Sequence, residues 1–348
     1  MPIRTKRLHR TVWLWIGCLP IAIFAAALWI VYIIGRPGIN GATPKGPIAD
    51  IDFAMSPTRD ELVFVGAGRG GSDLFVLDLK TRRVHSLVAS PDMEFDPAYS
   101  RSGKELVYAT SRMTEPSCSL AVLDLHLHKT RTIPHERGVS DRVPSFSPDG
   151  SKIVFARASR YRPYSWGGNI WDNWDIYTIG RDGTNLTRIT NQPYYLVSAP
   201  HFSPDGKSIC YSAVQFNSRA DDALYTIVAS PGGSPVPVNA GAFGSQPEYS
   251  PDGRKLLFIS DPTRSQQYDL AELSVAGGQP QGFGIVRQSA YNSSPHYSSD
   301  GKLVFFLADP NIQNRPRLRL WRMDKSKHSA VEFAGPELFE TPLQFVGH

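Results

Sequence analysis

The sequence predicts an all-β fold: a six-bladed β-propeller preceded by one N-terminal transmembrane helix. Three observations support this prediction. A motif built on Ser-Pro-Asp-Gly recurs in three exact and three degenerate copies, short apolar segments follow each copy, and an uncharged apolar segment lies near the N-terminus. The predicted organisation is a basic cytoplasmic tail at 1–11, a transmembrane signal anchor at 12–34, a Gly/Pro-rich linker at 35–50 and the propeller at 51–348.

The segment at 12–34 has the composition of a membrane anchor. It contains no charged residue, and its length exceeds the roughly 20 residues that a helix needs to cross a bilayer. Trp13 and Trp15 lie near one end and Trp29 and Tyr32 near the other, where interfacial aromatic residues are expected. A cleaved signal peptide is the alternative, but its apolar stretch spans only about 7–15 residues. We therefore expect an uncleaved anchor.

The charges around this anchor predict its orientation. Four basic residues precede it: Arg4, Lys6, Arg7 and Arg10. Shortly after it, the positive charges are Arg36 and Lys45. The positive-inside rule therefore places the N-terminus in the cytoplasm and the remainder of the chain outside it.

The repeat is the strongest signal in the chain. Its copies begin at Ser56, Ser100, Ser147, Ser203, Ser250 and Ser298, which are separated by 44, 47, 56, 47 and 48 residues. A proline lies three residues before the serine in five copies, and an aromatic residue directly before it in five. Each turn is followed by a short apolar strand, such as Ile153-Val154-Phe155, and then by a second one.

The chemistry of this motif explains the fold. Proline fixes φ, aspartate caps its own turn, and glycine accepts a positive φ, so the motif forms a tight turn between strands. The flanking segments are rich in β-branched and aromatic residues, which favour strands. One unit cannot bury both of its faces, whereas units stacked in a ring bury a continuous core and protect the strand edges.

These copies resemble the bacterial TolB-type propeller repeat. The resemblance rests on Pro-x-Phe/Tyr-Ser-Pro-Asp-Gly-x-x-Ile/Leu-x-Phe, with Asp-Ile-Tyr-Thr and Asp-Gly-Thr-Asn-Leu-Thr-Arg-Ile-Thr in the third copy, and covers roughly residues 51–335. It implies a six-bladed periplasmic propeller that binds other envelope proteins, and hence a bacterial inner-membrane location here. Two features depart from the family: the chain has no recognisable N-terminal α/β domain, and it carries a membrane anchor.

Several function classes lack support. The net charge is only +5 and no long basic run follows the tail, so nucleic-acid binding is not indicated. The chain has no Gly-x-Ser-x-Gly motif, phosphate-binding loop or dinucleotide fingerprint, and no zinc-type spacing of cysteines. Cys118 and Cys210 are interpreted as buried thiols, with a disulfide as the alternative. We expect no cofactor.

A first candidate binding site is an insertion in the third repeat, at 159–174. It is rich in aromatic residues and arginine, and rigid aromatic side chains give contact area at low entropic cost. The candidate ligand-binding residues are Tyr161, Arg162, Tyr164, Trp166, Trp171 and Trp174. The alternative is that Trp171 and Trp174 pack over the edge of the blade as a small core.

A second candidate lies on the ring axis. The residue between the repeat's proline and its aromatic residue is His201 in the fourth copy, Glu248 in the fifth and His296 in the sixth. Equivalent positions of innermost strands converge on the axis, so these residues are candidates for an acid–base set or a divalent-metal site. A resemblance to lyases that hold an axial metal supports this hypothesis. The alternative is that the three residues line a hydrated tunnel.

The sequence thus favours a non-enzymatic scaffold. We expect a membrane-anchored, extracytoplasmic propeller that binds an envelope protein, a peptide or a glycan through one ring face and the 159–174 insertion. A polysaccharide lyase or hydrolase that uses the axial residues is the alternative.

Overall fold

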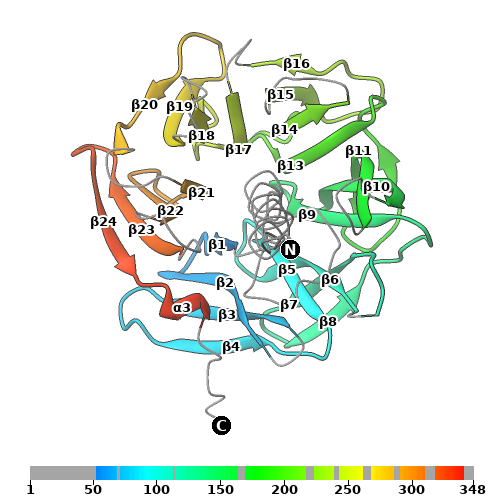
Figure 1. Ribbon diagram of the computed structural model, residues 1–348, viewed down its shortest axis with the longest axis horizontal. Helices are drawn as coiled ribbons and strands as arrows, with labels where there is room; N and C mark the ends of the chain where they lie inside the picture. The colour runs from blue at the N-terminus through cyan, green and yellow to red at the C-terminus, as the bar shows by residue number, and fades with distance from the viewer. Residues whose placement is uncertain are drawn as a thin grey trace, which may run out of the picture.

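The computed structural model describes residues 52–68, 71–112, 114–163, 169–216, 223–238, 243–261, 268–285, 291–309 and 318–340. The tail, the predicted anchor and the linker lie outside these ranges. Within them, no helix is long and apolar enough to cross a membrane. The described chain forms antiparallel sheets arranged in a ring around a central axis (Figure 1). The predicted all-β propeller fold is therefore confirmed.

Four of the six repeats form separate four-stranded sheets. The first contains β1 (Phe53–Met55), β2 (Glu61–Ala67), β3 (Ser72–Asp78) and β4 (Val84–Val88). The second contains β5 (Met93–Tyr99), β6 (Glu105–Ser111), β7 (Ser119–Asp124) and β8 (Lys129–Thr132). The fifth repeat contains β17 (Phe243–Tyr249), β18 (Lys255–Asp261), β19 (Asp269–Ser274) and β20 (Gln281–Gly282). The sixth contains β21 (Tyr291–Tyr297), β22 (Leu303–Asp309), β23 (Arg319–Asp324) and β24 (Ser329–Ala334).

The third and fourth repeats share one eight-stranded sheet. Its strands are β9 (Ser140–Phe146), β10 (Lys152–Pro163), β11 (Asn169–Gly180), β12 (Thr187–Arg188), β13 (Tyr194–Phe202), β14 (Ser208–Gln215), β15 (Ala223–Val228) and β16 (Val236–Pro237). The prediction of six separate blades was wrong in this respect, because the structure has four separate four-stranded blades and one double-width sheet.

The insertion in the third repeat explains the shared sheet. It extends β10 and β11 to 12 residues each, whereas β18 and β19 of the fifth repeat have 7 and 6. The longer β11 reaches the inner strand of the next repeat, where Trp174 pairs with Tyr194. Both side chains are buried in one hydrophobic cluster, which stabilises this additional pairing.

The Ser-Pro-Asp-Gly turns adopt the predicted geometry. In the fourth repeat, the Ser203 hydroxyl donates to Asp205 (2.6 Å) and accepts from the Ser208 N–H (3.0 Å), while Gly206 has a φ of +73°. Successive turns also touch. A Cβ added to Gly253 would lie 3.3 Å from the Pro204 ring, so this turn glycine also allows one repeat to approach the next closely.

These turn-to-turn contacts define the two faces of the ring. All six turns follow the inner strands, and they lie together on one side, which we call the turn face. The inner strands β1, β5, β9, β13, β17 and β21 begin on the opposite side, which we call the strand-start face. The chain that precedes Asp52 therefore joins the ring at the strand-start end of β1.

Side-chain packing joins the first and sixth repeats. One buried cluster combines Phe64 of β2 with Phe305 and Leu320 of the sixth repeat. The short helix α3 (Glu337–Glu340) adds Phe339, whose ring lies edge-on to Phe64 at 5.6 Å between centroids. Among the described strands, β24 pairs only with β23, so the ring closes here through packed side chains rather than a shared strand. Cys118 and Cys210 are both buried.

Candidate functional site

A cavity of about 520 Å³ lies on the ring axis. The inner strands of all six repeats contribute to its wall, and prolines of four Ser-Pro turns line its rim at the turn face: Pro57, Pro148, Pro204 and Pro251. The cavity also contains an aromatic residue from each of five repeats: Tyr99, Phe146, Phe202, Tyr249 and Tyr297. It therefore combines an apolar wall with the polar groups described below.

A β-bulge in five inner strands shapes this wall. In each, the residue before the repeat's proline has a positive φ of 45–53°, although none is glycine: Asp96, Val143, Ala199, Gln246 and Ser294. The strand register shifts at the same place in all five pairs. A bulge bends its strand and changes the direction of the side chains beside it. Because all five strands share it, the bulge belongs to the repeat rather than to one local site.

The three axial candidates all line this cavity. His201 lies on β13, Glu248 on β17 and His296 on β21. Each comes two residues after the bulge residue that has a positive φ. Glu248 Oε2 lies 3.3 Å from His296 Nδ1 and accepts a hydrogen bond from the Tyr297 N–H at 3.2 Å. The His296 ring also lies edge-on to Phe53, with centroids 4.8 Å apart. The fifth, sixth and first repeats therefore meet around His296.

Charge coupling distinguishes the two histidines. Burial disfavours the His296 cation, but the hydrogen bond and charge of Glu248, together with the charge of Asp52, outweigh it and raise the pKa of His296 above 6.5. Burial lowers the pKa of His201 to about 4, although Glu248 acts in the opposite direction. At neutral pH, His201 is therefore a neutral imidazole, whereas His296 holds its proton more tightly than an ordinary histidine does.

Two acidic residues extend this polar cluster. Burial and the nearby charge of Asp96 raise the pKa of Asp52 to about 6, while His296 and the hydroxyl of Ser294 oppose this shift. Asp96 itself accepts hydrogen bonds from Arg142 Nε (2.6 Å) and Nη2 (3.1 Å), so it is held in a buried ion pair. The cavity thus holds one carboxyl group with a raised pKa, Asp52, and one carboxylate held by a buried arginine, Asp96.

Asp52, Asp96 and Gln246 were not among the sequence candidates. All three occupy the position two residues before the axial position that carries His201, Glu248 and His296. Gln246 accepts a hydrogen bond from the Ser294 N–H (2.9 Å) and so links the fifth repeat to the sixth. Alignment of the six repeats would have shown that these three residues occupy one equivalent position. Only the bulge shows that this position and the axial position both face the axis.

The axial trio does not form a metal-ligand set in this arrangement. Among the described residues, no group of three or more His, Cys, Asp or Glu side chains is placed to hold a metal ion. His296 directs Nδ1 to Glu248, which already accepts a backbone N–H. The trio and Asp52 form a set of titratable groups that lie close to one another. Such a set can bind polar ligands or transfer protons.

The insertion in the third repeat forms a long β10–β11 hairpin. Trp171 and Trp174 belong to the hydrophobic core, where the Trp171 Nε1–H donates to the Pro116 carbonyl at 2.7 Å. These two residues therefore have the packing role that the alternative interpretation gave them. Tyr161 is 40% exposed and stacks at a tilt on Trp171, with centroids 4.9 Å apart. Tyr164 and Trp166 lie outside the described residues.

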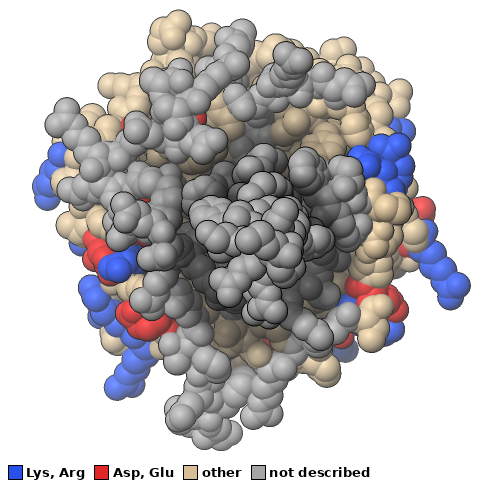
Figure 2. All heavy atoms as spheres, viewed as in Figure 1, with Lys and Arg blue, Asp and Glu red and all other residues tan. Residues whose placement is uncertain are grey.

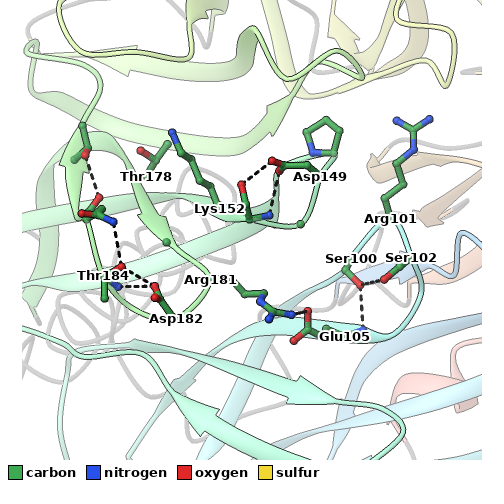
Figure 3. A pocket seen from close by; sticks show the side chains of 16 residues that line it. Ser100, Arg101, Ser102, Glu105, Asp149, Lys152, Thr178, Arg181, Asp182 and Thr184 are labelled. Carbon is green, nitrogen blue, oxygen red and sulfur yellow. Dashed lines mark hydrogen bonds and ion pairs between the residues drawn. The ribbon is translucent and has the colours of Figure 1, made fainter.

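A second, polar cavity lies on the turn face between the second and third repeats (Figure 3). Its carboxylates are already engaged: the Ser147 and Ser151 hydroxyls donate to Asp149, and Arg181 pairs with Glu105 at 2.8 Å. Arg101 lines both this cavity and the axial one. The groove has no large apolar side chain that could anchor a protein partner.

Known proteins give a consistent comparison. No protein family model matches the sequence. Tol-Pal system protein TolB from Francisella tularensis subsp. mediasiatica is 24% identical over 217 residues, which cover 59% of this chain and 44% of that protein. The chain is similar to TolB. The matched stretch thus spans less than half the length of this curated relative.

The structural comparisons show a shared fold. TolB from Acinetobacter baumannii aligns with a TM-score of 0.61 and 19% identity, covering 78% of this chain and 63% of that one. An oligogalacturonate lyase in complex with manganese aligns with a TM-score of 0.59 and 15% identity, covering 82% of this chain and 76% of that one. Because TolB and a lyase share this propeller at such low identity, the fold alone does not select between binding and catalysis.

Proposed function

We propose that this protein is a membrane-anchored, extracytoplasmic scaffold that binds an envelope protein through its axial cavity. In this proposal the segment at 12–34 holds the chain in a bacterial inner membrane, and the ring lies in the periplasm. The similarity to TolB supports an envelope location, and the charge pattern around the anchor supports the orientation.

The axial cavity is the observation that carries the binding proposal. Prolines and aromatic side chains give it an apolar wall, and a few polar groups lie at fixed positions on that wall. Concave sites of this composition suit an inserted peptide segment, because apolar contact supplies affinity and the polar groups fix the orientation. The cavity also reaches the turn face, opposite the end of β1 that connects to the proposed anchor, so a partner has access to it.

To test the proposal, the full chain is reconstituted in nanodiscs and used as the target to select binding peptides from a display library. The Kd of each selected peptide is then measured. Ala98→Trp would fill the axial cavity and should weaken binding at least tenfold, because the indole would occupy the space that the peptide needs. Leu127→Trp, at a position that is 66% exposed on a turn, is the matched control and should leave the Kd unchanged. Equal binding to both variants would contradict the proposal.

Catalysis at the same cavity is the second candidate, and the coupling of His296 to Glu248 and Asp52 is the observation that favours it. Residues with shifted pKa values that lie close together can divide acid and base roles. Under this hypothesis the full chain would cleave an acidic polysaccharide, and Glu248→Gln would abolish that activity. Cleavage that depends on Glu248 would replace the scaffold proposal with an enzymatic one.

A further inference from the structure

The β10–β11 hairpin projects from the strand-start face of the ring. Ser140, the first residue of β9, pairs with Ala158 of β10. Beyond this pair, β10 continues to Pro163, which pairs with Asn169 of β11. The hairpin therefore extends past the point where the inner strand begins, on the side of the ring where β1 connects to the N-terminal segment.

One face of this hairpin is cationic. Arg160 and Arg162 are 51% and 36% exposed, and both pair with Asp172, whose side chain is fully buried beneath them. Arg160 donates through Nε (2.5 Å) and Nη2 (3.1 Å), and Arg162 donates through Nε (2.5 Å). One carboxylate thus orients two guanidinium groups, which leaves one net positive charge and free N–H groups toward solvent.

Tyr161 and a neighbouring repeat flank this cationic face. Tyr161 lies between the two arginines in sequence, so its side chain points to the opposite face of the hairpin, where it packs on Trp171. The Arg160 guanidinium lies 5.4 Å from the centroid of the Phe216 ring, at the end of β14 in the fourth repeat. Figure 2 shows Lys and Arg side chains at the rim of the ring beside the position that β10 and β11 occupy in Figure 1.

We propose that Arg160, Tyr161 and Arg162 contact the anionic lipid surface of the membrane that holds the N-terminal anchor. The inference rests on the anchor in the proposed function. The 16 residues at 35–50 can span at most about 55 Å, so the strand-start end of β1 stays within that distance of the proposed anchor. Arginine recognises phosphate through paired N–H groups, and tyrosine favours the lipid headgroup region. This contact orients the axial cavity away from the bilayer.

The test uses the full chain with Cys18 replaced by alanine, reconstituted in vesicles of phosphatidylcholine with or without phosphatidylglycerol. A fluorophore is attached through Ser159→Cys on the hairpin or, as the positional control, through Ser326→Cys in the β23–β24 turn on the opposite face. Headgroup-labelled nitroxide lipids then report proximity. We expect quenching at position 159 but not at 326, in phosphatidylglycerol vesicles only, and its loss at high salt.

Variants separate lipid contact from folding. Arg160→Gln with Arg162→Gln would leave Asp172 buried without its cations, so Asp172→Asn is added to the same chain to preserve packing. Quenching at position 159 should then fall to the level at position 326. Tyr161→Ser, which keeps the ion pairs, should reduce it partially. The charge-matched control, Lys302→Gln with Lys327→Gln on the turn face, should change nothing.

The outcomes distinguish the two proposals. If the full chain is extracted from vesicles by alkaline carbonate, the anchor is wrong and both proposals fail. If the chain stays integrated but position 159 is unquenched, or is quenched equally in the triple variant, the lipid contact is overturned and the anchored scaffold stands. Quenching of position 326 instead would show that the ring has the opposite orientation, which also overturns the inference.

Discussion

His296 Nδ1 lies 3.3 Å from Glu248 Oε2, and the two residues come from the inner strands of adjacent repeats. Their separation in sequence is 48 residues, so the repeat brings them together. Glu248 raises the pKa of one axial histidine, while burial lowers that of the other. The ionisation of the axial cavity therefore depends on contacts between repeats, and each contact can be tested.

We predict that Glu248→Gln lowers the pKa of His296, because the variant removes the charge that outweighs burial. A histidine whose pKa is raised by folding stabilises the native state fully below its unfolded value of 6.5. That contribution is lost as the pH rises through the folded value. Histidine NMR titration measures the shift. Glu332→Gln, on the outer strand β24, is the control, and an unchanged His296 pKa in Glu248→Gln would contradict the assignment.

His201 should make the protein sensitive to acid. Its folded pKa is about 4, so the unfolded chain binds a proton more readily and stability falls as the pH drops from 6.5 to 4. The loss is on the order of 2–3 kcal/mol. Urea unfolding at several pH values should show a smaller loss for His201→Gln, whereas His85→Gln, at an exposed position, should behave as the wild type. Identical acid profiles for all three proteins would refute this prediction.

The buried Arg142–Asp96 pair should be essential to the inner wall. Arg142→Ala would leave the Asp96 carboxylate buried without its guanidinium partner, at a cost of about 3–5 kcal/mol in the free energy of unfolding. Arg142→Gln combined with Asp96→Asn removes both charges and should cost clearly less. Chemical denaturation at pH 7 compares the two. A double variant that is as unstable as Arg142→Ala would show that packing, rather than the unpaired charge, dominates.

Substitutions in the β10–β11 hairpin should distinguish a side chain that packs in the core from one that lies at the surface. Trp174→Ala removes a fully buried side chain and should cost about 3–5 kcal/mol in unfolding free energy. Tyr161→Ala, at a partly exposed site, should cost about 1 kcal/mol or less. Thermal unfolding of both variants measures the difference. Comparable losses would mean that Tyr161 belongs to the core, against its proposed role at the surface.

The sequence predicted the parts of this fold that are encoded locally. Ser203, Asp205 and Gly206 form a turn from adjacent residues, so their pattern alone was sufficient. The repeat register also placed His201, Glu248 and His296 at equivalent positions, and the structure finds all three on one cavity.

Features that depend on distant contacts were not predicted. The union of the third and fourth repeats depends on the pairing of Trp174 with Tyr194, and no local pattern encodes the reach of β11. The Arg142–Asp96 pair joins residues 46 positions apart in neighbouring repeats. The bulge was also missed, because the sequence shows its proline but not the positive φ of the residue before it.

The most direct test of the central claim is a histidine NMR experiment on the full chain in nanodiscs, with a library-selected peptide added. If the axial cavity is the binding site, the His201 and His296 signals shift together on saturation while those of exposed His85 and His328 stay in place. Saturable binding that shifts His85 or His328 and leaves both axial signals unchanged would place the ligand elsewhere and contradict the proposed function.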